Sequence, residues 1–279
     1  MLFRFNFLVE LYMIPPKLPT LGEYCKWFEF NCSPENMMPL IPTIIRLDGV
    51  NFHSWTKGLD RPYDSRLTSI MKELTKELVD LTNAKVGYTQ SDEITLVLYS
   101  DDITKKIYHN GEKSKILSKL AAFTSVVFNE KVKVHLPEKS KLATFDARIF
   151  QVPNLEWAYK QLLWRENDAI KNSVSTLAQT HFPHKSLQHL KRDQLIEKLL
   201  IKKNIVWSDY PDSYKRGTYF KRKVYTFTYE SMSAEELAKL PPKHNAFKNP
   251  ELKFERSLVE ELIIPVLITR DMNWVEALF

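Results

Sequence analysis

The sequence predicts an α+β fold in which an antiparallel sheet is backed by helices. Two observations predict it. Between residues 43 and 152, segments with strand and helix periodicity follow in the order strand, helix, strand, strand, helix, strand. This β-α-β-β-α-β order is the ferredoxin-like pattern. The composition, 44% hydrophobic and 27% charged among 279 residues, is that of a globular chain and excludes a mostly disordered one.

The first strand and the first helix have clear local signals. Residues 43–48 (TIIRLD) are β-branched and apolar and end at a charge, which is typical of a strand, and Gly49 then ends it. A helix is expected to begin near Asp64 or Ser65, either of which is a suitable N-cap. Apolar side chains then recur at helical spacing over residues 67–81.

The next elements complete the pattern. Two short apolar runs, 85–89 and 94–99, are joined by QSDE at 90–93, which predicts a β-hairpin. A second amphipathic helix is expected over 114–128, and a fourth strand over 144–152.

The rest of the chain suggests three parts. We predict an N-terminal segment over 1–40, a core over 41–153, and a helical and β-hairpin region over 154–279 that packs on the core. Helices are expected over 154–200, with a basic strand pair near 215–229. Trp157 and Trp164 lie seven residues apart in the helical stretch, and we expect both to pack in the core.

Cysteine content and hydropathy indicate the compartment. Two cysteines exclude a disulfide scaffold, and their spacing fits no zinc site. No apolar stretch reaches the ~20 residues that a membrane span needs. The apolar start is interrupted by Glu10 and is not followed by a small-residue cleavage site. These features predict a cytoplasmic protein with no membrane association.

Positive charge is concentrated at residues 215–223. The chain carries a net charge of +6, and this stretch holds five bases in nine residues, interleaved with aromatics. Such a stretch can follow a phosphate backbone and stack on bases. Taken alone, the stretch is more typical of a strand with a solvated basic face, which we favour. The partner is therefore either a nucleic acid or a small acidic molecule such as a nucleotide.

Two aspartates stand out by position. Asp48 ends the first strand, and Asp92 lies in the hairpin turn beside Glu93. In the predicted fold they are neighbours at one edge of the sheet, among apolar residues, where carboxylates are costly unless a cation joins them. Mg²⁺ is commonly held by one or two carboxylates plus substrate phosphates. The alternative is that both acids are ordinary turn residues.

The surroundings of Asp48 favour the phosphate interpretation. The stretch GVNFH at 49–53 can present successive backbone N–H groups to a triphosphate. Arg46, Arg61 and Lys115 supply the cations that such a ligand requires.

Together these motifs resemble the tRNA-His guanylyltransferase family, whose members are 3′-to-5′ nucleotide-adding polymerases. The motifs that carry the resemblance are RLDGVNFH at 46–53, RPYD at 61–64, GYTQSDE at 87–93, SK at 114–115, FDAR at 145–148, WREND at 164–168 and YKRGT at 214–218. They cover most of the chain from about residue 20. The late segment PPKH at 241–244, together with Pro265 and the closing LF at 278–279, is closer to the bacterial-type branch.

The resemblance implies a polymerase palm with two Mg²⁺ ions held by Asp48, Asp92 and the backbone carbonyl of Gly49. Glu93 is the third catalytic candidate, or an acid that orients the hairpin. The nucleotide-binding residues that it implies are Arg46, Asp48, Gly49, Val50, Asn51, Phe52, His53, Arg61, Asp64, Ser91, Asp92 and Lys115. Arg61 stands where the family usually has Lys, and Asp64 would recognise or position the base. Asp146 is either a third acid near the metals or a structural residue, and we favour the latter.

The resemblance also implies partners. ATP or GTP would be substrates, tRNA would be held by the helical and basic regions, and the protein would be a homotetramer. The RNA-binding candidates are Asn172, Lys215, Arg216, Lys221 and Arg222.

One motif departs from the family. Eukaryotic members read His-Ile-Asn-Asn where this chain reads IKNS at 170–173, which keeps Asn172 but lacks the His. That motif is tied to the tRNA-His anticodon, so its change favours template-dependent repair of 5′-truncated tRNA. The alternatives are G addition to tRNA-His only, a palm-fold nucleotide cyclase, and an RNA-binding module without activity.

Overall fold

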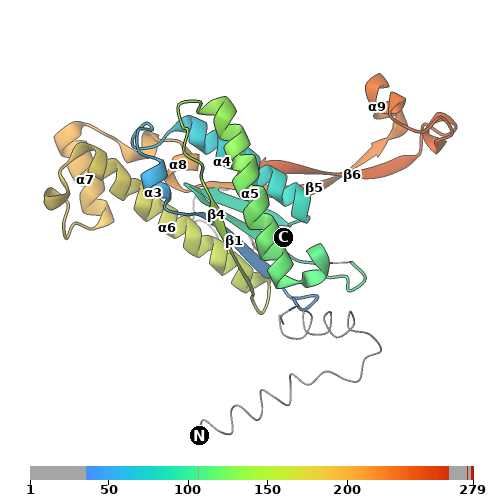
Figure 1. Cartoon of the computed structure of the whole chain (residues 1–279), viewed down its shortest axis with the longest axis horizontal. Coiled ribbons are helices and arrows are strands. Elements are labelled where there is room, and N and C mark those ends of the chain that lie inside the picture. Colours follow the sequence, from blue (N-terminus) through green and yellow to red (C-terminus); the bar gives the residue numbers. More distant parts are fainter. Residues whose placement is uncertain (1–35, 106, 264–274, 276–277) are drawn as a thin grey trace, which may run out of the picture.

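The fold is a six-stranded antiparallel sheet with helices on both faces (Figure 1). The computed structural model describes residues 36–105, 107–263, 275 and 278–279. Most of the predicted 1–40 segment lies outside these residues. The strands are β1 (Thr43–Gly49), β2 (Val86–Gln90), β3 (Glu93–Leu98), β4 (Phe145–Gln151), β5 (Thr218–Thr228) and β6 (Lys253–Leu262). The longer helices are α4 (Ser65–Thr82), α5 (Lys113–His135), α6 (Leu155–His181) and α7 (Arg192–Lys203), with short helices α3 (Phe52–Trp55), α8 (Asp212–Lys215) and α9 (Ala234–Ala238).

The strand order confirms the predicted topology. The sheet runs β4-β1-β3-β2-β5-β6, and its first four strands have the ferredoxin-like order. The α+β fold with helices backing an antiparallel sheet is therefore confirmed. One detail of the prediction is wrong: β1 and β3 are central strands, so Asp48 and Asp92 lie at strand ends in the middle of the sheet. β4 pairs with β1 and β2 pairs with β3, so each of the two central strands is held by a neighbour on its outer side.

Alternation along β1 divides the core into two layers. Ile45 and Leu47 are buried against α4 and α5 on one face, whereas Ile44 is buried with residues of α6 on the other. This alternation follows from the period of two along a strand. Arg46 and Asp48 therefore share the α6 face with Ile44.

The strand pair expected near 215–229 is wrong in its pairing. Residues 218–228 form one strand, β5, whose partner β6 begins only at Lys253. The two strands leave the body as a long ribbon with α9 near its tip (Figure 1). No helix in the described residues is long and apolar enough to cross a bilayer. The division into parts at residues 40 and 153 stays a prediction.

An aromatic cluster joins the first core layer to α3. The Phe128 ring lies 5.5 Å from Phe52, 5.3 Å from Trp55 and 5.1 Å from Phe145, measured between ring centroids. These edge-on contacts are typical of packed aromatic rings. Through Phe52 and Trp55, the cluster fixes the segment that follows β1.

We expect Phe128→Ala to lower the free energy of unfolding by about 3–5 kcal/mol, because it leaves a cavity among rings that cannot collapse into it. Urea denaturation measures the change. The matched control is Val134→Ala on the same helix, whose side chain is 73% exposed. A cost for Phe128→Ala no larger than that of the control would contradict this account of the core.

Candidate active site

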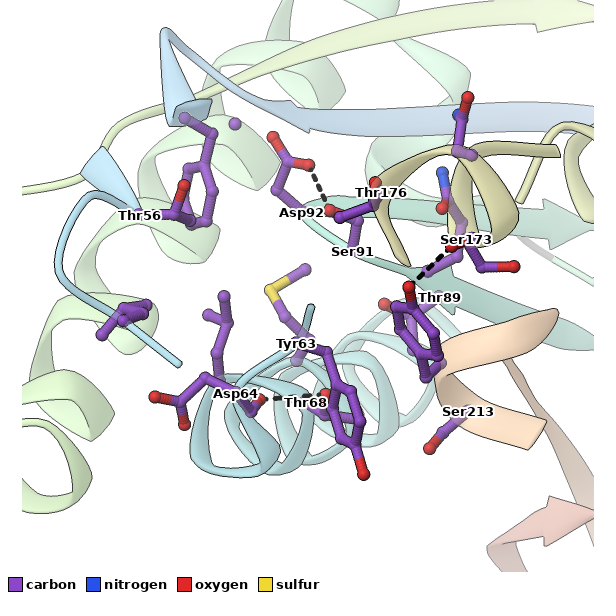
Figure 2. Close-up of a pocket in the computed structure, with 18 of the residues that line it drawn as sticks. Thr56, Tyr63, Asp64, Thr68, Thr89, Ser91, Asp92, Ser173, Thr176 and Ser213 are labelled. Atoms are coloured by element: carbon purple, nitrogen blue, oxygen red, sulfur yellow. Dashed lines mark hydrogen bonds between the residues drawn. The ribbon is translucent and has the colours of Figure 1, made fainter. Parts of the chain in front are cut away.

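A cavity of about 640 Å³ opens where β1, the β2–β3 turn, α3, α4 and α6 meet (Figure 2). Asp48 and Asp92 line it, as do Gly49, Asn51, Phe52 and His53 from the segment after β1. Arg61, Asp64, Ser91 and Asn172 also line it. The structure thus brings most of the predicted site residues to one cavity.

The two aspartates are electrostatically coupled. Asp48 lies opposite Glu93 in the β1–β3 register, and Asp92 is in the adjoining turn. The Ser91 hydroxyl donates a hydrogen bond to Asp92 Oδ1 over 2.9 Å (Figure 2). Burial raises the pKa of Asp92 to about 6, and the charges of Asp48 and Glu93 add to the rise. The site therefore concentrates negative charge that a cation would relieve.

Gly49 brings the backbone against this charge. A Cβ at position 49 would lie 2.3 Å from Phe52 Cδ2 and 3.0 Å from Asp92 Oδ2. Only a residue without a side chain fits between the ring and the carboxylate. The described residues hold no cluster of three or more His, Cys, Asp or Glu side chains suited to a metal. Two carboxylates and a carbonyl oxygen instead fit Mg²⁺, which keeps waters and takes phosphates as its other ligands.

The segment after β1 is shaped for a phosphate. Asn51 adopts a left-handed conformation with φ of 53°, and α3 begins at the next residue. The amides of Phe52 and His53 are in the first turn of α3 and have no acceptor within it. Phe52 itself is buried in the aromatic cluster and anchors the segment, whereas His53 is exposed. A direct contact of either side chain with nucleotide stays a prediction.

Asp64 is the N-cap of α4, as its sequence position indicates, and its carboxylate is fully engaged. Its Oδ1 accepts from the backbone N of Arg66 over 3.0 Å, and its Oδ2 accepts from Arg66 Nη2 over 2.7 Å. Hydrogen bonding to Arg66 holds the pKa of Asp64 below its usual value despite the burial. Of the two roles expected for Asp64, this geometry fits positioning better than base recognition.

We expect Asp64→Asn to lower the free energy of unfolding by about 1 kcal/mol at pH 7, since the charged pair is lost while a capping side chain remains. Because the folded-state pKa lies below the unfolded value, the stabilisation is present above about pH 4 and is lost as pH falls through the folded pKa. Urea unfolding from pH 7 to pH 2.5 measures this. Asp101→Asn, at an exposed residue, is the control. A difference that grows on acidification would refute the assignment.

Glu93 is tied to α6. It is the buried first residue of β3, and its two carboxylate oxygens accept from Arg165 Nε, over 2.7 Å, and from Arg165 Nη2. Trp164 lies under the same guanidinium, which is 4.7 Å from its ring centroid. This two-point contact fixes α6 against the hairpin, which fits the orienting role for Glu93. A catalytic contact stays a prediction.

The expectation that the tryptophans of α6 are core residues is wrong. Trp157 is 47% exposed and Trp164 is 54% exposed. Each ring instead packs under a cation of its own helix, Lys160 and Arg165 respectively. Helical spacing places two residues on one face but does not say whether that face is buried.

Arg46, Val50 and Lys115 are predicted nucleotide ligands that do not line the cavity. Arg46 is half-buried on the α6 face, and its Nε has no partner in the described part of the chain. Lys115 is on α5 and lies 3.4 Å from Glu112. Contacts of these residues with a nucleotide stay predictions.

The five RNA-binding candidates lie in different surroundings. Asn172 lines the cavity, and its Nδ2 lies 3.4 Å from Asp168 Oδ2. Three cations pair within the chain: Lys215 and Arg216 with Asp212, at 3.2 and 2.9 Å, and Arg222 with Asp80, at 2.8 Å. The fifth candidate, Lys221, is half-buried on β5. An RNA phosphate would have to compete with these acids.

Three tyrosines and a lysine of the cavity region were not predicted from sequence. The rings of Tyr63 and Tyr214 stack at 4.8 Å, and Tyr210 packs beside both. Tyr214 donates from its hydroxyl to the Ser173 carbonyl oxygen over 2.6 Å. Lys72 of α4 also lines the cavity. Tyr63 lies in the motif at 61–64 and Tyr214 opens the motif at 214–218, and these two motifs were the signals for this group.

Comparison with known proteins shows one family match and two similar solved structures. Residues 22–153 match the sequence family described as tRNAHis guanylyltransferase. A bacterial tRNA(His) guanylyltransferase-like protein solved in complex with ATP is 36% identical with a TM-score of 0.68, and the match covers 72% of this chain and 88% of that one. A bacterial protein of the same description in complex with GTP is 27% identical with a TM-score of 0.69, and the match covers 93% and 99% of the two chains.

Two curated relatives also match this chain. An uncharacterized protein of Acanthamoeba polyphaga mimivirus is 32% identical over 231 residues, which are 73% of this chain and 77% of that protein. The tRNA(His) guanylyltransferase of Debaryomyces hansenii is 29% identical over 160 residues, or 54% of this chain, and the match spans 57% of the yeast protein's length. With a shared fold, 36% identity to a solved relative over most of both chains, and a match in the segment that carries both aspartates, this chain belongs to the tRNA-His guanylyltransferase family of nucleotidyltransferases.

Proposed function

We propose that this chain adds nucleotides to the 5′ end of tRNA in the 3′-to-5′ direction, directed by the opposite strand, and thereby repairs truncated 5′ ends. The observation that carries the proposal is the coupled pair Asp48 and Asp92. The pair faces a cavity of about 640 Å³, beside the segment 49–53 whose backbone amides can bind phosphate. A cavity of this size is within the range of small-ligand sites. The relatives solved with ATP and with GTP support a nucleoside triphosphate as its occupant.

The reaction would have two steps. In the first, an oxygen of the tRNA 5′-monophosphate attacks the α-phosphate of ATP or GTP, and pyrophosphate leaves. In the second, the 3′-hydroxyl of an incoming NTP attacks the activated 5′-phosphate, gives up its proton, and expels the nucleoside monophosphate. The product is a tRNA that is one nucleotide longer and carries a 5′-triphosphate.

The residues of the chain have separable tasks in this scheme. Asp48, Asp92 and the carbonyl of Gly49 would hold two Mg²⁺ ions, which when bound neutralise charge on attacking and leaving oxygens. The amides at the start of α3 would donate hydrogen bonds to a triphosphate oxygen. Arg61 adds a cation to the cavity wall. The ion pair between Glu93 and Arg165 holds α6 in a fixed position against the β2–β3 hairpin.

The proposal also covers which tRNA is the substrate and how many copies of the chain assemble. The change from His-Ile-Asn-Asn to IKNS at 170–173 supports repair over strict tRNA-His specificity. Asn172 lines the cavity on α6, where a bound RNA end could contact it. The chain would assemble as a homotetramer, as the family resemblance implies.

The test is incorporation of each labelled NTP, supplied alone with Mg²⁺, at the 5′ end of a tRNA that lacks its first nucleotide and carries a 5′-monophosphate. We expect only the NTP complementary to the opposite base to be added. Changing that base should change which NTP is used. Full-length tRNA-His is assayed in parallel.

Other outcomes are informative. Addition of G to tRNA-His alone, whatever the opposite base, would replace repair by guanylyl transfer, which the names of the relatives favour. No addition to either RNA would overturn the proposal and leave the cyclase and RNA-binding alternatives.

A further inference from the structure

Residues 136–141, which belong to the connection between α5 and β4, lie beside the cavity wall formed by α3. Lys139 Nζ donates to the carbonyl oxygen of Lys57 over 2.9 Å and to that of Trp55. The same ammonium lies 4.9 Å from the centroid of the Trp55 ring. One side chain thus binds the end of α3 through two backbone carbonyls and an aromatic face.

The contact is reciprocated by the segment's own backbone. Trp55 Nε1 donates to the carbonyl oxygen of Lys141 over 2.7 Å. The last carbonyls of a helix have no partner within it, and a cation there is favourable. Lys139 therefore satisfies groups that would otherwise need water, at the end of α3 opposite the proposed phosphate site.

A second connection reaches the other cavity wall. Glu138 Oε1 lies 2.8 Å from Arg66 Nη1, and Arg66 in turn binds the carboxylate of Asp64. The chain immediately after the segment is anchored on α5, because Asn129 exchanges hydrogen bonds with both the N–H and the carbonyl of Ala143. Neighbouring residues 138 and 139 thus reach the two cavity-lining segments that flank Gly58.

We propose that residues 136–141 act as a latch that holds the nucleotide-binding segment, with Lys139 as a positioning residue for the nucleotide. The proposal rests on the proposed function, since it assumes that residues 49–53 bind the triphosphate. Lys139 does not line the cavity and touches no reacting atom. Its effect passes through the end of α3 to the amides at the start of that helix.

The change to make is Lys139→Met, which removes the ammonium but keeps a long side chain over Trp55. We expect the KM for the NTP to rise about tenfold and kcat to change less than about threefold, because a displaced binding segment weakens ligand capture before chemistry. Lys139→Arg, which can donate to both carbonyls, should restore most of the affinity.

The matched control is Lys141→Met. It removes the same charge two residues along the same segment, and only the backbone carbonyl of Lys141 takes part in the latch. Thermal unfolding of both variants establishes that each is folded. If Lys139→Met does not fold, Lys139→Gln keeps an uncharged N–H donor group, and its KM should lie between that of wild type and ten times that value.

Hydrogen exchange separates the latch from the proposed function. In Lys139→Met without ligand, the amides of residues 50–57 should exchange at least about fivefold faster than in Lys141→Met. Equal exchange and equal KM in the two variants would overturn the latch. Faster exchange in an enzyme that adds no nucleotide would leave the latch standing and overturn the proposed function instead.

Discussion

Asp92→Asn and Asp48→Asn are each expected to lower nucleotide addition by on the order of a thousandfold, the largest effect of any substitution in this chain. Each removes one of the two charges that the geometry turns toward the cavity, and an amide is a poor ligand for a hard divalent cation. Single-turnover incorporation at saturating NTP measures the loss. It separates chemistry from binding.

The two variants should at the same time keep or gain stability. Burial and the charges of Asp48 and Glu93 already disfavour the charged form of Asp92, which raises its pKa. Replacing either aspartate by a neutral isostere relieves this repulsion when no cation is bound. Thermal unfolding without Mg²⁺ should therefore give a melting temperature equal to or above that of wild type. Loss of activity with unchanged stability is the pattern of a functional charge.

Asp146→Asn is the matched control. Asp146 is the cross-strand neighbour of Asp48 on β4, yet its side chain is exposed. We expect this variant to keep its activity within a few-fold, in line with the structural role favoured for Asp146. Full activity in either Asp48→Asn or Asp92→Asn would remove the basis of the two-metal proposal. An inactive Asp146→Asn would add a third acid to the site.

The central sheet could be predicted from sequence because its signals are local. The β-branched run at 43–48 and the helical spacing after Asp64 need no knowledge of distant residues. The partner of β5 could not be predicted, because 24 residues separate β5 from β6 and they contain no short hairpin turn. Antiparallel pairing across such a gap depends on contacts that only the folded chain shows.

The candidate site could likewise be predicted where its signals are local, but not where they depend on distant residues. The positions of Asp48 and Asp92 follow from strand ends and a hairpin turn, which a sequence pattern can place. The partners of the other charges could not be predicted: Glu93 binds Arg165, 72 residues away, and Arg66 binds Glu138, also 72 residues away. In the basic cluster 215–223, Lys215 and Arg216 pair with the nearby Asp212, whereas Arg222 pairs with the distant Asp80, a partner that the sequence does not reveal.

Gly217→Ala is expected to be the most destabilising of the small substitutions, at about 3–4 kcal/mol or more. The residue has a φ of +81°, and a Cβ there would lie 2.5 Å from the carbonyl oxygen of Thr89 and 2.7 Å from the Tyr88 ring. The carbonyl belongs to β2, so it cannot move without separating β2 from β5. Thr89 and Thr218 pair across that junction and both line the cavity. The expected loss therefore includes the cavity wall, and NTP affinity should fall together with stability.

Gly58→Ala separates the two causes of this loss. Gly58 has a φ of +89°, close to that of Gly217, but a Cβ there would meet nothing within 4 Å. Both alanines carry the backbone strain, which costs about 1–2 kcal/mol. Only Gly217→Ala adds the clash. In urea denaturation, Gly217→Ala should cost at least about 2 kcal/mol more than Gly58→Ala. Equal costs would mean that β5 can shift away from β2, and that the contact at Thr89 does not fix the cavity wall.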